Sequence, residues 1–461
     1  MNPQMHKQKK LNQRIIMLTT KKLSAIVILT FVFLFNITFI YAEDVHEWVI
    51  SPTEVVKYGL AVPDFKPGKN STVITPRQIK SIIESDLEIS GLFVKVKNDK
   101  FVEQQRSADI ATGKMNFVEW VRLGTAVLVL GEYESDGTTI NVRCDVYDVS
   151  SQQVVFRKKY PAEIKNIVLL AHTISDDIIS YYAAGRIGIA RTKILYISNA
   201  HNPRVVDKKE VYMMDYDGGN KTRLTYDNNL AATPCWGANL TEFYYTSYKY
   251  FNPDLYGQYI NSGKNWSISS KPGFNLSPNF SQKLNKIVLT LGKDGNSEVY
   301  IMDRDGKNLK RLTFNKYIDS SPSWFPSGNN ILFTSDRSGR PQVYVMDADG
   351  LNQRRLTFQG RYNDSSVCSP KEDRIAFAGS TGGKFNIFTM DTSGNHWLQL
   401  TSSQGNNEDP SWAPDGEHIV FTSDRTGRPN IYIMNADGSN VRQLTKEGLN
   451  ISAAWSPLLY K

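Results

Sequence analysis

The stretch Gly328–Thr357 reads GNNILFTSDRSGRPQVYVMDADGLNQRRLT, and a closely similar stretch returns 88 residues later as Gly416–Thr445. Its most distinctive part is Met-Asp-x-Asp-Gly, followed by a basic and polar run that ends in Leu-Thr. The methionine of this motif recurs at positions 302, 346, 390 and 434, in steps of 44, and also at 214, two steps before 302. The copy expected near Gln258 keeps the strand-like residues but lacks the acidic turn. Repeats of this length therefore make up the C-terminal part of the chain.

A period of 40 to 45 residues with four short β runs in each repeat is typical of propeller blades. In the copy that contains Gly350 the runs are 323–325, 331–334, 343–346 and 354–357, and turn-forming residues separate them. The region 191–461 has room for six such repeats. The C-terminal Ala454–Leu458 matches the first run of the other repeats, whereas the repeat at Ile194–Ile197 lacks that run. We expect a six-bladed β-propeller over 191–461, in which the C-terminal strand completes the first blade and closes the ring.

Residues 43–188 contain no such repeat and predict a mixed α/β domain. We expect strands at 60–65, 126–130, 140–147 and 154–160, and helices that begin at Pro76 and cover 116–122 and 163–182. The helix at Pro76 follows Thr75, a good N-cap, and places proline in its first turn. A short link at 184–188 joins this domain to the propeller.

The first 42 residues have the pattern of a secretory signal. A basic segment ends at Lys21-Lys22, an apolar run covers Leu23–Tyr41, and Ala42 is a plausible cleavage position. An uncleaved membrane anchor is the alternative. This segment holds six of the eight net positive charges of the chain, so the remainder gives no case for nucleic-acid binding. We expect export with a cleaved signal and a mature protein that does not span a membrane.

The cysteines and the acidic turns do not predict disulfides or metal sites. The chain has three cysteines, Cys144, Cys235 and Cys368, and an odd number argues against a disulfide framework. Cys368 stands where other repeats have tryptophan, so we expect a small buried hydrophobic residue there. Asp-x-Asp-Gly resembles the start of a calcium loop, but such a loop needs Glu eleven residues after its first Asp. Tyr226, Phe314 and Phe358 stand at that position, so hairpin turns are expected.

The six histidines are scattered through the chain and do not form a recognisable ligand set. His172 lies on the expected long helix, where a capping or core role is more common than a functional one. We therefore expect no metal, no cofactor and no catalytic residues.

Several local stretches carry a family resemblance besides the blades: Gly59–Phe65, Asp86–Phe93, Ala171–Asp177, Pro322–Pro326 and Trp455–Pro457. Together with the signal, the α/β domain and the six repeats, they resemble the TolB family of exported propeller proteins in the Tol–Pal envelope system. The resemblance covers essentially the whole chain after residue 42. Blade motifs alone are shared with other propellers, including those of prolyl peptidases.

The resemblance implies a non-enzymatic periplasmic protein that supports outer-membrane integrity and constriction during cell division. Its propeller would bind the peptidoglycan-associated lipoprotein Pal, and its mature N-terminal segment would bind the inner-membrane protein TolA. Other outer-membrane proteins are further candidate partners. The N-terminal segment is only loosely similar to that of the family. Its candidate docking residues are Glu43, Asp44, Val45, Trp48, Val49 and Ile50.

In a propeller the innermost strands line the central channel, and we expect the residues before the opening tryptophan of each repeat to form its mouth. The candidate partner-binding residues there are Thr233, Ser277, Asp319, Ser320, Ser321, Asp364, Ser365, Glu408, Asp409 and Ser452. The alternative is a set of solvated loop ends, because Ser and Asp are common before strands. A cation held among the four acidic residues is a further alternative that we do not favour.

Two classes of function remain open. One is a binding module of the cell envelope, and the other is a secreted propeller hydrolase or lyase that acts on peptides or sugar polymers. A peptidase of the prolyl type needs a separate hydrolase domain with Gly-x-Ser-x-Gly, which this sequence lacks. An enzyme also needs convergent titratable groups at the mouth, whereas docking needs shape and complementary charge. The sequence favours docking.

Overall fold

The computed structural model describes residues 57–68, 71, 76–97, 99–402 and 404–458, and these described residues belong to one compact unit. The expected signal, 1–42, and the candidate docking residues Glu43, Asp44, Val45, Trp48, Val49 and Ile50 lie outside the described residues. Within the described ranges, no helix combines the length and the apolar character needed to cross a membrane.

The N-terminal domain is built on one mixed sheet with the strand order β3-β1-β4-β5-β6. Its strands are β1 (Tyr58–Ala61), β3 (Phe93–Lys95), β4 (Val127–Ser135), β5 (Thr139–Asp148) and β6 (Gln153–Glu163). The short β2 (Lys66–Pro67) pairs with β4. The first strand runs parallel to β3 and β4, whereas β4, β5 and β6 form an antiparallel meander.

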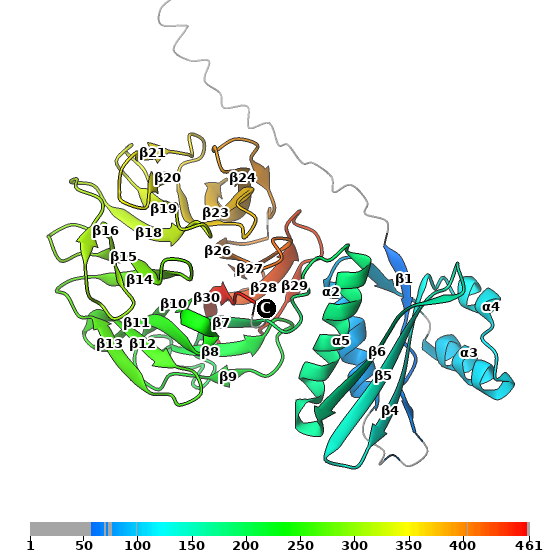
Figure 1. Cartoon of the computed structure of the whole chain (residues 1–461). Coiled ribbons are helices and arrows are strands. Elements are labelled where there is room, and N and C mark those ends of the chain that lie inside the picture. The colour runs from blue at the N-terminus through cyan, green and yellow to red at the C-terminus, as the bar shows by residue number, and fades with distance from the viewer. Residues whose placement is uncertain (1–56, 69–70, 72–75, 98, 403, 459–461) are drawn as a thin grey trace, which may run out of the picture. The chain divides into compact units, whose positions relative to one another are not determined.

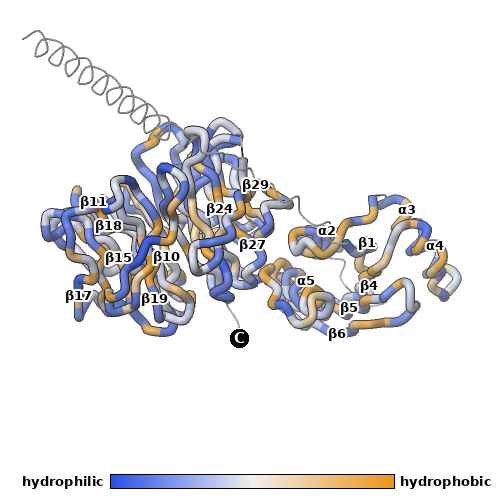
Figure 2. The backbone as a smooth tube through the Cα atoms, turned by 90° about the horizontal axis from the view of Figure 1, so that it is seen from above, coloured by the Kyte–Doolittle hydropathy of each residue, from blue (hydrophilic) through white to orange (hydrophobic). Residues whose placement is uncertain are grey.

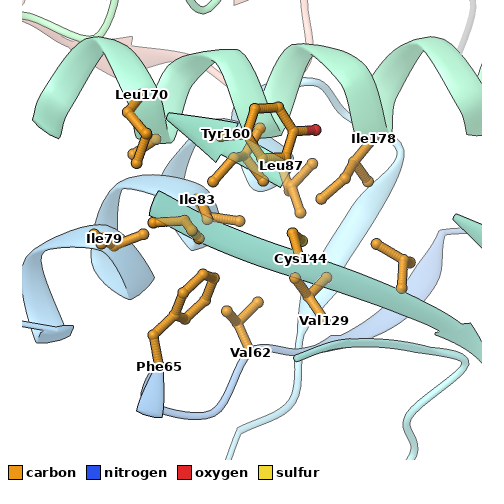
Figure 3. Close-up of a cluster of buried hydrophobic side chains, with 14 of the residues drawn as sticks. Val62, Phe65, Ile79, Ile83, Leu87, Val129, Cys144, Tyr160, Leu170 and Ile178 are labelled. Atoms are coloured by element: carbon orange, nitrogen blue, oxygen red, sulfur yellow. The ribbon is translucent and has the colours of Figure 1, made fainter. Parts of the chain in front are cut away.

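Two long helices cover the sheet of this domain and share its main core. They are α2 (Pro76–Ile89) and α5 (Ile167–Tyr182), and the shorter α3 (Asp99–Thr112) and α4 (Phe117–Arg122) pack elsewhere on the domain. Figure 3 shows Ile79, Ile83 and Leu87 of α2 close to Leu170 and Ile178 of α5. The three α2 residues are each four positions apart, so they lie on one face of the helix. The predicted α/β domain is confirmed, with strand and helix ends that shift by a few residues.

Helix α3 was not predicted from the sequence, because it lacks a continuous apolar face. Among its residues only Val102 and Asp109 are buried. The carboxylate of Asp109 accepts hydrogen bonds from the Trp120 indole at 2.7 Å and from the Asn116 backbone N–H at 2.9 Å. A buried polar anchor therefore holds this helix where a hydrophobic stripe would normally do so.

The C-terminal part of the chain forms six four-stranded antiparallel sheets, which we number as blades in chain order. Blade one contains β30 (Asn450–Trp455), β7 (Lys193–Ser198), β8 (Glu210–Asp215) and β9 (Thr222–Arg223). Blade two contains β10 (Ala231–Trp236), β11 (Glu242–Tyr250), β12 (Asn252–Tyr259) and β13 (Asn265–Ser269). Blade three contains β14 (Asn275–Ser281), β15 (Lys286–Leu291), β16 (Glu298–Asp303) and β17 (Lys310–Arg311).

The remaining three blades follow the same pattern. Blade four contains β18 (Asp319–Trp324), β19 (Asn330–Ser335), β20 (Gln342–Asp347) and β21 (Arg354–Arg355). Blade five contains β22 (Asn363–Cys368), β23 (Arg374–Thr381), β24 (Lys384–Asp391) and β25 (Leu398–Gln399). Blade six contains β26 (Asn407–Trp412), β27 (His418–Ser423), β28 (Asn430–Asn435) and β29 (Arg442–Gln443).

The first strands of the six sheets contact one another in sequence, from β10 through β14, β18, β22 and β26 to β30, and β30 contacts β10. In Figure 1 the labels of β10, β14, β18, β26 and β30 lie toward the middle of the ring, while β9, β13 and β21 lie at its edge. The C-terminal β30 pairs antiparallel with β7, from Asn450 opposite Ser198 to Trp455 opposite Ile194. The predicted six-bladed propeller and its closure by the C-terminal strand are confirmed.

The Asp-x-Asp-Gly turn of one blade packs against the leucine of the Leu-Thr end of the preceding blade. Gly350, in the Asp-x-Asp-Gly turn of blade four, has a positive φ of 96°, and a Cβ there would lie 2.8 Å from the backbone oxygen of Leu312 in blade three. The same contact joins Gly394 to Leu356 and Gly438 to Leu400. Gly218 of blade one meets Leu444 of blade six in the same way, which completes the ring.

The acidic residues of these motifs shape hairpin turns, as the sequence predicts. Asp349 accepts a hydrogen bond from the Leu351 backbone N–H at 3.0 Å, and Asp437 accepts one from Ser439 at 2.9 Å. The threonine that ends the motif ties the outer strand to its neighbour. Thr357 Oγ1 accepts from the Val343 backbone N–H at 2.9 Å and donates to Gln342 at 2.7 Å.

The hydrophobic cores of the two domains are ordinary in composition. Figure 2 shows hydrophobic and hydrophilic segments alternating along the chain, with the hydrophobic strands separated by hydrophilic turns. Cys144, Cys235 and Cys368 are all buried and free. Burial raises the pKa of each thiol, that of Cys235 to about 12, so these cysteines are inert.

Candidate functional site on the aromatic face of the propeller

The predicted mouth residues lie within the innermost strands, whereas the sequence placed them before these strands. Strand β18 begins at Asp319, four residues before the expected run, and Asp319 and Ser320 pair with Ser335 and Thr334 of β19. The register of the pair then shifts between Ser320 and Ser323. The same shift occurs at the same place in all six innermost strands. A bulge, which a sequence pattern of alternating residues does not reveal, therefore extends each strand.

The third residue of every innermost strand adopts a left-handed backbone conformation, with φ between 45° and 53°. These residues are Thr233, Ser277, Ser321, Ser365, Asp409 and Ser452. In each strand the first and fourth residues are buried, while the second and third are partly exposed. We call the twelve partly exposed residues the axial ring. They are Ala232, Thr233, Leu276, Ser277, Ser320, Ser321, Asp364, Ser365, Glu408, Asp409, Ile451 and Ser452.

Hydrogen bonds between blades show that residues of the axial ring lie close together. The Ser277 backbone N–H donates to Thr233 Oγ1 at 3.3 Å. The hydroxyls of Ser365 and Ser452 donate to the two oxygens of Asp409 at 3.4 and 3.1 Å. The structure therefore brings together the predicted residues Thr233, Ser277, Ser365, Asp409 and Ser452 from five different blades.

Asp319 does not belong to this ring, and its assignment as a docking residue is corrected. Its side chain is fully buried and accepts hydrogen bonds from Arg337 Nη2 at 2.8 Å and from Asn315 Nδ2 at 2.7 Å. The equivalent first residues of β14, β22, β26 and β30 are buried asparagines. The first residue of each of these strands therefore anchors the strand inside its blade. The sequence Asp-Ser-Ser does not reveal which of its three side chains is buried.

One half of the axial ring is acidic, because Asp364, Glu408 and Asp409 come from the adjacent blades five and six. Burial raises the pKa of Glu408, and the charges of Asp409 and Asp364 raise it further. Burial and Asp364 also raise the pKa of Asp409, although its hydrogen bond from Ser452 opposes this change. The other half, in blades two to four, is uncharged. The ring is therefore complementary to a segment with a positive charge on one side and hydroxyl or apolar groups on the other.

Several exposed aromatic residues lie on loops at the same end of the blades as the start of the innermost strands, and no role was predicted for them from the sequence. Tyr226, Phe314 and Phe358 are 67%, 72% and 73% exposed, and each follows the Leu-Thr of its repeat. In each case the guanidinium group of the arginine three residues earlier lies over the aromatic side chain, with its carbon 4.3 to 4.9 Å from the centroid of that aromatic ring. Other exposed aromatics lie on the loops into the innermost strands or on the β11–β12 hairpin. The aromatic rim comprises Tyr226, Tyr250, Phe251, Phe274, Phe314, Tyr317, Phe358 and Tyr362.

The strand pairing places the whole rim on one face of the propeller, which we call the aromatic face. In each sheet the loop that enters the first strand lies at the same end as the hairpin between the second and third strands, as the pairing of Ala231 with Ser247 shows. On the opposite face, the large hydrophobic residues that are exposed within the described ranges are Tyr259, Leu284, Leu351 and Val441. A recurring aromatic after Leu-Thr was the sequence signal that could have revealed this surface.

The N-terminal domain contacts the face of the propeller opposite the aromatic face. His418 of blade six donates from Nε2 to the backbone oxygen of Ile89 at 3.0 Å, and Tyr216 of blade one donates to Asp86 at 2.7 Å. Tyr216 lies in the turn between the third and fourth strands of its blade, and His418 follows the turn between the first and second strands. These contacts of the described residues of the N-terminal domain therefore leave the aromatic face uncovered.

Among the described residues, one group of three His, Cys, Asp or Glu side chains lies close enough to share a metal ion: Asp86, His172 and Asp217. Both oxygens of Asp86 already accept hydrogen bonds, from His172 and from Tyr216. We therefore do not assign a metal to this group. His172 is buried, as predicted for a core residue, but its position is between the two domains.

The chain has an α/β domain followed by a six-bladed propeller, and its C-terminal strand closes the propeller ring. This architecture defines a class of two-domain propeller proteins. A family model described as the TolB beta propeller domain matches residues 183–403 and 368–458. A second model, described as the TolB amino-terminal domain, matches residues 49–155. The chain belongs to the TolB family.

Relatives and a solved structure agree with this assignment. The "Tol-Pal system protein TolB" of Desulfosudis oleivorans is 29% identical over 259 residues, which cover 56% of this chain and 58% of that protein. The "Protein TolB homolog" of Chlorobium chlorochromatii is 32% identical over 282 residues, 61% of this chain and 62% of that protein. The chain thus aligns with about three-fifths of the length of these curated relatives. The crystal structure of TolB from Acinetobacter baumannii shares the fold, with a TM-score of 0.76, 24% identity and coverage of 88% of this chain and 98% of that chain.

Proposed function

We propose that this protein is the TolB component of a Tol-Pal system, a non-enzymatic periplasmic binding protein that supports outer-membrane integrity and constriction during cell division. The family match to both domains carries this proposal. The names of the relatives add the Tol-Pal system to it. Export would use the cleaved signal at 1–42.

The lipoprotein Pal is the partner that we assign to the aromatic face. The aromatic rim offers large rigid side chains, which are typical anchors of protein interfaces, and the axial ring offers hydroxyl and acidic groups at the centre. The N-terminal domain contacts the opposite face and leaves this surface accessible. A loop of Pal that inserts over the ring would bury the rim residues around it.

The segment that contains Glu43, Asp44, Val45, Trp48, Val49 and Ile50 is the proposed docking element for TolA. This part of the proposal rests on the family alone, because the segment lies outside the described residues. Other outer-membrane proteins that compete with Pal for the aromatic face are further candidate partners.

One observation favours the alternative of a propeller hydrolase or lyase. Glu408 and Asp409 are adjacent carboxylates with raised pKa values, and such pairs can act as general acid and base. However, both oxygens of Asp409 accept hydrogen bonds from serine hydroxyls, and the axial ring contains no His, Cys, Lys or Arg. We therefore favour binding over catalysis.

A pull-down from envelope extract with residues 43–461 tests the proposal. Pal should be retained by the wild-type protein and lost by a variant that combines Phe314→Ser with Phe358→Ser. Leu351→Ser is the matched control, because Leu351 is also strongly exposed but lies on the opposite face. Retention of Pal by the aromatic variant would remove the aromatic face from the proposal. Absence of Pal, together with a Glu408-dependent breakdown of peptides or sugar polymers, would favour the enzyme.

A further inference from the structure

Two buried histidines connect the N-terminal domain to the propeller. The first, His172 on α5, donates from Nδ1 to Asp86 Oδ2 at 2.8 Å. The other oxygen of Asp86 accepts from the Tyr216 hydroxyl of blade one at 2.7 Å. All three side chains are almost completely buried. Asp86 on α2 therefore joins both domains through one carboxylate.

The environment of His172 favours a second proton on its ring. Its Nε2 is buried and has no hydrogen-bond partner, and it lies 3.9 Å from Asp215 Oδ2. Asp217 also faces the ring from the same turn, and Asp215 is itself held by Lys193 and Asn220. Burial opposes a positive charge here, but Asp86, Asp217 and Asp215 outweigh it and raise the pKa of His172.

His418 of blade six is the second buried histidine that contacts the N-terminal domain. Its Nε2 faces the backbone oxygen of Ile89 at 3.0 Å, and its Nδ1 faces Asp415 Oδ2 at 2.8 Å. A carbonyl and a carboxylate only accept hydrogen bonds, so both ring nitrogens face acceptors. Ile89 ends α2, where a positive charge is stabilised by the helix dipole. Arg186 is the other charged group that acts on Asp415, and it donates to the Ser90 backbone oxygen.

Two further carboxylates at this interface also favour proton binding. Asp176 of α5 accepts from the Ala190 backbone N–H and from Arg191, at 2.8 and 2.7 Å. Burial nevertheless raises the pKa of Asp176, and it raises that of Asp217 as well. Asp415 is the exception, because the charge of His418 lowers its pKa against the effect of burial. On balance the docked domains hold protons that separated domains would release.

We propose that this interface is a pH-sensitive latch, in which protonated His172, together with the contact made by His418, holds the N-terminal domain against the propeller. A raised histidine pKa makes the docked state stable below the ordinary value near 6.5 and progressively weaker as the pH rises through the raised value. Each proton released would weaken docking about tenfold per pH unit above that value. The proposal rests on the contacts of the interface and does not depend on the partner of the aromatic face.

Small-angle X-ray scattering of residues 43–461 between pH 5.5 and 9 tests the latch. The wild-type radius of gyration should increase toward high pH as the domains separate. The variant His172→Gln with His418→Gln should be extended at all of these pH values. His396→Gln is the matched control, because His396 also bonds to an aspartate, Asp391, but is 86% exposed. A radius that stays constant over the whole range in the wild-type protein would overturn the proposal.

Nitrogen-15 NMR of histidine-labelled wild-type protein keeps the test independent of whether the variants fold. The spectrum at pH 6 should show an imidazolium ring for His172, which releases its proton as the radius of gyration increases. A neutral His172 ring at pH 6 would refute the latch. So would a stabilisation by zinc ions that His172→Gln abolishes, because the buried ring would then bind a metal in place of a proton.

Discussion

At the scale of single residues, glycine at the end of the Asp-x-Asp-Gly turn sets how closely two blades approach. Gly350 combines a left-handed backbone with a position directly against Leu312 of the preceding blade. Gly339 has almost the same φ, 95°, but nothing lies within 4 Å of the place that a Cβ would take. Substitutions at Gly339 and Gly350 therefore separate the free-energy cost of a left-handed backbone from the free-energy cost of the contact between blades.

We expect Gly339→Ala to lower the free energy of unfolding by about 1 to 2 kcal/mol, the cost of a left-handed alanine. Gly350→Ala should lower it by about 2 to 5 kcal/mol, because the added Cβ also pushes two blades apart. Urea denaturation followed by circular dichroism measures both values. Equal losses for the two variants would show that the contact between blades does not limit stability.

At the scale of elements, the repeated threonine holds the outermost strand of each blade. Thr225, Thr313, Thr357, Thr401 and Thr445 all accept a hydrogen bond from the third strand at 2.9 Å. The outermost strands contain only two residues each in five of the blades, so backbone pairing alone gives them little support. The hydroxyl therefore replaces hydrogen bonds that a longer strand would make.

Thr357→Val should lower the free energy of unfolding by about 1 to 3 kcal/mol, because it removes the acceptor of the buried Val343 N–H and one of the two hydrogen bonds to the Gln342 oxygen, which Asn363 alone would then donate to. Thr357→Ser keeps the hydroxyl and should cost less. Denaturant titrations of the two variants provide the comparison. A valine variant as stable as the serine variant would mean that shape, and not hydrogen bonding, explains the threonine.

The sequence predicted the elements well where the repeat itself carries the signal. The period of the Met-Asp-x-Asp-Gly motif located five of the blades, and the unmatched Trp455 indicated ring closure. It did not reveal α3, which is anchored by the polar Asp109, or the bulges that extend the innermost strands. The axial ring was therefore located approximately, with Asp319 wrongly included, because neither the direction of a side chain at a bulge nor its burial follows from residue type. The aromatic rim was missed because its members are close only in the folded ring.

At the scale of the whole molecule, the propeller depends on its last strand. Trp455 of β30 is buried and donates from Nε1 to Thr192 Oγ1 at 2.8 Å, and its strand is the first strand of blade one. Without β30, blade one would lose its contacts with β26 and part of its contacts with β10, and β7 would present an unpaired edge.

Truncation after Leu449 should abolish the cooperative thermal unfolding of the propeller, and addition of a peptide with the sequence of residues 450–461 should restore part of it. Differential scanning calorimetry records both effects. A truncated protein with an unchanged melting transition would show that the ring closes without its C-terminal strand.

The two faces of the propeller differ in what lies on them, because the N-terminal domain contacts one face. Contacts from Tyr216 and His418 occupy one face, and the aromatic rim with the axial ring occupies the other. The proposed latch and the proposed partner site therefore lie on different faces of the propeller.

The central claim is that Pal binds the aromatic face through the acidic half of the axial ring. Isothermal titration of purified Pal into residues 43–461 tests it most directly, with Asp364→Lys combined with Glu408→Lys as the variant. Asp349→Lys, which reverses an exposed charge on the opposite face, is the control. We predict that the ring variant loses affinity about tenfold or more while its melting temperature and the affinity of the control stay unchanged. Unchanged affinity of the folded ring variant would contradict the account.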